Sequence, residues 1–234
     1  MKAWTTSTGH RVVRVIAGRS NVFLLTFDGR NLLIDSGPPS MWKTLEKKLE
    51  LLGVRSVDYL VLTHTHYDHA GNAWRIKEKF KAKVIVHSSE AGYLANGDNI
   101  LPQGTNWFSR LLMSLVVKKF NSVARYSPCS FDLLIDSTFD MTQSGFDAFI
   151  LHTPGHTQGS VSVIISKEIA LVGDTMFGIF RGSVFPPFAN DIRELIKSWG
   201  DLLETGCRLF LPSHGSENPR ELVMKNYNRK IISL

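Results

Sequence analysis

The amino-acid sequence predicts a mixed α/β fold in which two β-sheets pack face to face and helices cover their outer faces. Short apolar runs rich in β-branched residues alternate with helix-like stretches in both halves of the 234-residue chain. The composition, 43% hydrophobic and 21% charged, is typical of a globular protein and argues against a disordered chain or a pure coiled coil. Because no run approaches ~18 apolar residues, we expect no transmembrane segment.

The first half of the chain predicts strands, a hairpin turn and two helices. Asp28 and Gly29 separate two strand-like runs and are typical of a tight hairpin turn. Leu45, Leu49 and Leu52 recur at helical spacing, and a glycine follows them, which favours a helix end there. A second helix is expected at about 70–80. The strands expected in this half are 12–17, 22–27, 32–34, 59–62 and 84–86.

The second half repeats this order of strands and helices. We expect a helix at about 192–203 and a last helix after Asn218. The strands expected in this half are 133–135, 148–151, 161–165, 169–172 and 209–211. We interpret residues 1–234 as a single domain that contains both sheets.

The segment 88–130 breaks this pattern, and it predicts an insertion that forms a lid over the active site, at one end of the sheets. Within it, the stretch 107–125 is apolar and basic, and no acidic residue occurs between Asp98 and Asp132. A second interpretation stays open, in which an apolar stripe in this stretch lies on an anionic membrane surface or contacts a partner.

The cysteines and the charge bear on location and partners. Cys129 and Cys207 lie far apart without a CxxC motif, so the sequence predicts neither a disulfide framework nor a cysteine-rich metal site. Reduced thiols of this kind are typical of the cytoplasm, where we expect the protein.

The net charge of +6 favours anionic partners, but the basic residues around the helix at 70–80 are typical of a solvated face, so no nucleic-acid partner is expected. These residues are Arg75, Lys77, Lys79, Lys81 and Lys83.

A dense group of potential metal ligands follows the strand expected at 59–62. On an extended backbone, residues two apart point to the same side, so His64, His66 and Asp68 are expected to converge. His69 lies one residue farther on, where the chain turns into a helix, and Gly71 allows the backbone to pack closely there. Imidazoles and a carboxylate at this spacing suit Zn²⁺ or Fe²⁺.

Three further candidate ligands each follow an apolar strand. His156 lies in the turn after the strand expected at 148–151, Asp174 follows 169–172, and His214 follows 209–211. Because all these residues lie at strand ends, they predict one shared metal site rather than separate surface positions.

The runs HTHYDHAGN, HTPGHTQGS, GDT and SHG occur in this order and resemble the metallo-β-lactamase superfamily of metal-dependent hydrolases. The resemblance spans almost the whole chain. It implies a four-layer αβ/βα sandwich of two mixed sheets, with two divalent metal ions at one edge between the sheets. Zn²⁺ is expected, with Fe²⁺ or Mn²⁺ as alternatives. The implied first-metal ligands are His64, His66 and His156, the implied second-metal ligands are Asp68, His69 and His214, and Asp174 is the implied bridge.

The resemblance also implies a chemistry and supporting residues. A metal-bridging hydroxide would attack a carbonyl or phosphoryl centre, with Asp68 as the catalytic residue that holds it and passes a proton to the leaving group. Asp35 matches a family position that hydrogen-bonds the metal-binding loop and does not ligate metal. His152 is expected to have a structural role, His87 to face the lid or support a ligand, and His10 to have no role in the site.

Cleavage of a small ester, either a lactone or a thioester, is the expected function. Asp174 argues against a β-lactamase, and few residues follow His214, so we expect a lactonase-like or glyoxalase-II-like member without a C-terminal substrate domain. A phosphodiesterase or nuclease, and a mononuclear-iron persulfide dioxygenase, stay open as alternatives. The basic, apolar insertion favours an anionic or amphipathic small-molecule substrate. The sequence does not indicate an oligomeric state.

Overall fold

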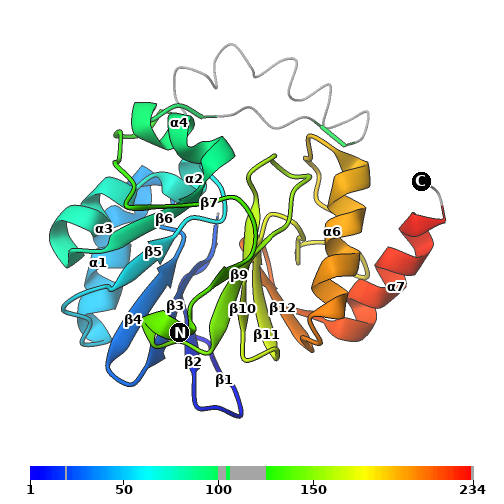
Figure 1. Ribbon diagram of the computed structural model, residues 1–234, viewed down its shortest axis with the longest axis horizontal. Helices are drawn as coiled ribbons and strands as arrows, with labels where there is room; N and C mark the ends of the chain where they lie inside the picture. Colours follow the sequence, from blue (N-terminus) through cyan, green and yellow to red (C-terminus); the bar gives the residue numbers. More distant parts are fainter. Residues whose placement is uncertain (19, 100–103, 106–124, 233–234) are drawn as a thin grey trace.

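The fold has four layers, helix, sheet, sheet and helix, and Figure 1 shows the two sheets facing each other between the outer helices. The structure is a computed structural model that describes residues 1–18, 20–99, 104–105 and 125–232. Both sheets contain parallel and antiparallel pairs, so the αβ/βα sandwich of two mixed sheets that the sequence predicts is confirmed.

The first sheet contains seven strands that lie side by side in chain order. Strands β1 to β4 pair antiparallel, and β4 to β7 pair parallel. The strands are β1 (Ala3–Thr5), β2 (Arg11–Ile16), β3 (Val22–Phe27), β4 (Arg30–Ile34), β5 (Tyr59–Val61), β6 (Lys83–His87) and β7 (Leu133–Ile135).

The second sheet contains six strands in the order β13-β12-β11-β10-β9-β8. The β11 and β12 pair is parallel and the others are antiparallel. The strands are β8 (Phe139–Asp140), β9 (Ala148–His152), β10 (Val161–Ile165), β11 (Ile169–Gly173), β12 (Leu209–Pro212) and β13 (Asn218–Pro219).

The helices cover the outer faces of the sheets. In Figure 1, α1 and α3 lie outside the first sheet, whereas α6 and α7 lie outside the second. Asp191 begins α6, because its side chain accepts hydrogen bonds from the backbone nitrogens of Arg193 and Glu194, at 2.8 and 3.0 Å. The helices are α1 (Trp42–Leu51), α2 (Tyr67–Ala70), α3 (Ala73–Phe80), α4 (Ser88–Asn96), α6 (Ile192–Glu204) and α7 (Arg220–Ile231), with short 3₁₀ turns at Pro39–Met41 and Thr142–Ser144.

The hydrophobic core consists of three slabs, one between each pair of adjacent layers. The two faces of each strand supply different slabs because successive side chains point to opposite sides. In β3, Leu24 packs toward the outer helices, whereas Phe23 and Leu25 pack between the sheets. In β10, Ile164 faces α6 and its neighbour Val163 faces the other sheet. Alternating apolar faces therefore fix the order of the layers.

Two elements differ from the sequence-based expectation. The strand at Leu133–Ile135, expected in the second half, pairs parallel with β6 and completes the first sheet. The helix expected at about 70–80 is present as α3 but begins at Ala73, after the separate short helix α2; between them, the Asn72 side chain donates to the backbone oxygens of Ser36, Gly37 and Pro38. These bonds tie the break to the loop that follows β4.

The segment expected to form a lid falls mostly outside the described residues. The structure shows that its beginning forms α4, whereas 106–124, with nearly all of the apolar and basic stretch, is not described. The lid therefore stays a prediction. Within the described ranges, none of the helices has the length and apolar character needed to cross a membrane.

Candidate metal centre

The segment from the end of β5 through α2 carries four candidate ligands, His64 and His66 in the loop and Asp68 and His69 in α2, and Asp35 holds both ends of this segment. The buried Asp35 carboxylate accepts hydrogen bonds from the Thr63 backbone nitrogen at 2.8 Å, the His69 Nδ1 at 2.8 Å and the Ser213 hydroxyl at 3.1 Å. Asp35 thereby joins the loop of the first sheet to the strand end that carries His214. It hydrogen-bonds the loop as expected from the sequence.

A second buried carboxylate, that of Glu90 on α4, holds the middle of the same loop. Glu90 Oε2 accepts a hydrogen bond from the Thr65 backbone nitrogen at 2.9 Å and another from the Thr65 hydroxyl. The Tyr126 hydroxyl donates to the Thr65 backbone oxygen at 2.9 Å. Because Thr65 lies between His64 and His66, these bonds orient both histidines.

Two strand ends of the second sheet place Asp174 and His214. The Trp199 indole of α6 donates to the Thr175 backbone oxygen at 2.7 Å, which holds the residue next to Asp174. The Asn21 side-chain amide donates to the backbone oxygens of Pro212 and Gly215, at 2.9 and 3.0 Å, so it holds the chain on both sides of His214.

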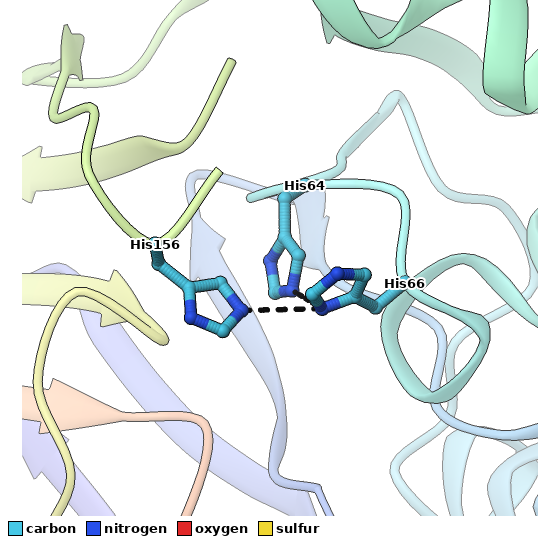
Figure 2. Close-up of side chains that lie close together, drawn as sticks. All are labelled: His64, His66 and His156. Atoms are coloured by element: carbon cyan, nitrogen blue, oxygen red, sulfur yellow. Dashed lines mark hydrogen bonds between the residues drawn. The ribbon is translucent and has the colours of Figure 1, made fainter. Parts of the chain in front are cut away.

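His64, His66 and His156 form a compact group of imidazoles, shown in Figure 2. The His66 Nδ1 lies 2.9 Å from the His64 Nε2 and 3.1 Å from the His156 Nε2. The His156 Nδ1–H donates to the Phe188 backbone oxygen at 3.0 Å, which leaves the lone pair of Nε2 directed into the group. Burial lowers the pKa of all three histidines, and it therefore favours the neutral form that can ligate a metal.

Asp68, His69 and His214 form a second group, and Asp174 lies between the two groups. The Asp174 Oδ2 is 3.5 Å from the His156 Nε2 and 3.3 Å from the His214 Nε2. The Asp174 Oδ1 is 3.5 Å from the His69 Nε2, and the Asp68 Oδ2 is 3.5 Å from the His214 Nε2. A single carboxylate therefore contacts histidines of both groups.

The carboxylates concentrate negative charge at the second group. Burial alone would lower the pKa of His69, but Asp174, Asp68 and Asp35 together raise it to about 10. Burial would raise the pKa of Asp174, but the positive charges of His214 and His69 outweigh it and hold this pKa well below its usual range. The carboxylates around the second group therefore stabilise positive charge there.

The donor set fits divalent metal ions. The His69 Nε2 and the Asp174 Oδ1 are buried and have no hydrogen-bond partner among the described residues, although unmet buried polar atoms are costly. Tetrahedral zinc with Zn–N distances of ~2.0–2.1 Å places its ligand nitrogens roughly 3.3 Å apart, close to the spacings within the first group. All seven residues singled out in the sequence lie in groups that could hold a metal ion.

A family model described as the metallo-beta-lactamase superfamily matches residues 15–214. The chain belongs to the metallo-β-lactamase superfamily. A relative from Methanocaldococcus jannaschii named a probable metallo-hydrolase is 30% identical over 160 residues, which cover 68% of this chain and 69% of the relative. This superfamily member is accordingly a metal-dependent hydrolase.

Two further comparisons extend the likeness across most of this metallo-β-lactamase superfamily member. An atrochrysone carboxyl ACP thioesterase from Aspergillus fumigatus is 25% identical over 232 residues, covering 94% of this chain and 61% of the thioesterase. ST1585 from Sulfolobus tokodaii, an archaeal superfamily protein of known crystal structure, matches at a TM-score of 0.67 with 20% identity, over 94% of this chain and 86% of that one. The similarity to the ST1585 structure, at 20% identity, supports the fold alone.

Three remaining histidines lie outside the groups that could hold a metal in the described part of the chain. The His87 and His152 rings stack with centroids 4.2 Å apart, and the His152 Nε2–H donates to the Gln158 backbone oxygen at 2.8 Å. The His87 Nδ1 accepts from the Ser89 backbone nitrogen at 3.2 Å and begins α4. His10 is buried against Phe27 and accepts from the Asp147 backbone nitrogen at 3.1 Å. The contacts of His152 agree with the structural role expected for it.

Sequence reasoning missed the residues that orient the ligands. Glu90 lies in the first turn of α4, where acidic residues are common, so its sequence context gave no sign of burial. Asn21 and Tyr126 likewise act through contacts with residues far away in the sequence.

Of the basic residues around α3, Lys77 pairs with Asp132 and Lys79 pairs with two glutamates of α1, as expected of a solvated face.

Proposed function

We propose that the chain is a binuclear metal-dependent hydrolase that cleaves a small ester-type substrate, either a lactone or a thioester. The observation that carries this proposal is the position of the Asp174 carboxylate, which contacts His156 of one group and His69 and His214 of the other. His64, His66 and His156 would hold one metal ion and Asp68, His69 and His214 the other, with Asp174 shared. The nitrogen and oxygen donors favour zinc, with iron or manganese as alternatives.

Bound divalent metals supply a hydroxide at neutral pH and stabilise the oxyanion that forms when a carbonyl is attacked. Asp68 is the proposed catalytic residue because its side chain reaches the solvent-accessible cavity in front of both groups. Its carboxylate can accept a proton from the attacking water and pass it to the leaving oxygen or sulfur. Asp35 and Glu90 do not enter that cavity, and they keep the ligands in place through backbone hydrogen bonds.

The choice of an ester-type substrate is supported by the similarity to a protein named a thioesterase, which extends over most of this chain. We keep two other reactions as alternatives: phosphodiester cleavage, and persulfide oxidation at a single iron in the first group. We also propose that the substrate is a small molecule and that the protein is located in the cytoplasm.

The test is hydrolysis by metal-free and metal-reconstituted protein. Chelation should lower the turnover of thioesters or lactones by at least ~10²-fold, and added Zn²⁺ or Mn²⁺ should restore it, because the metals supply the nucleophile. The same preparations are tested on a phosphodiester, and on a persulfide with iron under oxygen monitoring. Undiminished ester hydrolysis after complete metal removal would contradict the proposal, as would turnover confined to the phosphodiester or to the persulfide.

A further inference from the structure

The cavity in front of the two ligand groups has an apolar wall. The cavity has a volume of about 340 Å³, near the lower limit for small-molecule sites. Apart from the candidate ligands, Tyr67 and Asn99, its lining consists of apolar side chains, and among the described residues no lysine or arginine lines it. The apolar side chains are Phe177, Ile179, Pro187 and Phe188.

This wall contacts two of the candidate ligands, His214 and His156. The Gly178 backbone nitrogen donates to the His214 backbone oxygen at 2.7 Å, and the Phe177 ring lies 4.6 Å from the His214 ring, centroid to centroid. On the other side, the Phe188 backbone oxygen accepts the hydrogen bond that orients His156. The wall therefore has a fixed position relative to both groups, and it borders the cavity that a substrate of these groups would enter.

Two neighbouring residues at the wall are exposed apolar side chains. Ile179 is 56% exposed although it lines the cavity, and the next residue, Phe180, is 52% exposed. Large apolar side chains that lie together at the mouth of a cavity are typical of ligand-binding surfaces. A charged group placed against Phe177, Ile179, Pro187 and Phe188 would lose water without gaining a charged partner from these four side chains.

We propose that this wall binds an uncharged, apolar acyl chain of the substrate, and that Ile179 determines the preferred chain length. The inference rests on the proposed ester hydrolysis and narrows its substrate class. Each methylene group buried against the wall should improve kcat/KM by about fourfold until the wall is filled. A carboxylate at the end of the chain should remove that gain.

The first measurement compares acetyl, butanoyl, hexanoyl and succinyl thioesters with the metal-loaded protein. We expect kcat/KM to rise from acetyl to hexanoyl, with succinyl at least ~10-fold below butanoyl. Ile179→Asp should lower kcat/KM for the hexanoyl ester about 10-fold more than it lowers kcat/KM for the acetyl ester, because only the longer chain reaches this side chain. Ile232→Asp, at an 88% exposed position at the end of α7, is the matched control and should behave as the unmodified protein.

The second measurement is binding of alkyl hydroxamates of the same chain lengths by calorimetry, which needs no turnover. Binding should tighten with chain length, and Ile179→Asp should abolish this gradient. The inference would be overturned, even if the esters are cleaved, by an affinity that does not change with chain length or by a higher kcat/KM for the succinyl than for the butanoyl ester. Equal effects of Ile179→Asp and Ile232→Asp would overturn it as well. A clear gradient without cleavage of any ester would support the apolar site and reject the proposed hydrolysis.

Discussion

Replacing Asp174 by alanine should abolish hydrolysis, with kcat/KM falling by at least ~10³-fold, because the variant loses the carboxylate shared by both ligand groups. Asp174→Asn keeps the shape but removes the charge, so it should retain the fold and lose most of the activity. The loss is measured as kcat/KM on the best ester of the substrate panel, with metal in excess.

The control for this prediction is Asp201→Ala, which removes an exposed carboxylate from α6 and should leave kcat/KM unchanged. Circular dichroism and thermal unfolding of all variants show whether the fold is kept. Activity of Asp174→Ala within tenfold of the unmodified protein would exclude a bridging role for this carboxylate.

Gly155→Ala should be strongly destabilising, by ~3 kcal/mol or more in the free energy of unfolding. Gly155 has φ +128, a conformation that side chains with a Cβ rarely adopt, and an added Cβ would overlap the backbone of Leu195. The substitution should also lower activity, because His156 is the next residue. The measurement is the denaturant midpoint and slope of each variant.

Gly18→Ala is a close control for backbone strain. Gly18 has φ +132, nearly the same angle, but apart from its neighbours in the chain no atom of the described residues lies within 4 Å of an added Cβ. This variant should lose only the strain cost of about 1–3 kcal/mol and keep its activity. If Gly155→Ala and Gly18→Ala lower the free energy of unfolding equally, the overlap with Leu195 does not contribute to the loss.

The candidate ligands could be singled out from the sequence because each follows closely on the end of a strand. Apolar strands followed by glycine-rich turns place His64, His156, Asp174 and His214 at the same edge of the sandwich, so the sequence pattern carries the geometry. The order of strand-like and helix-like runs in both halves similarly made the layers predictable, although β10 is buried on both faces and its sequence does not show which face meets which layer.

What the sequence did not indicate depends on contacts between distant residues. The break between α2 and α3 lies where Asn72 bonds to the loop after β4, and β7 joins the first sheet by pairing with β6. Glu90 binds Thr65 across the interior, so its role follows only from the folded arrangement. The wall near Ile179 has neither strand nor helix periodicity, because it is formed by two irregular segments.

The most direct test of a two-metal centre is the stoichiometry of Zn²⁺ binding to the metal-free protein, measured by calorimetric titration and by elemental analysis of the product. We expect two equivalents for the unmodified chain and one or fewer for His64→Ala and for His214→Ala, which remove one ligand from each group. An unmodified chain that binds no zinc, or variants that still bind two equivalents, would contradict the assignment of these side chains as the ligands.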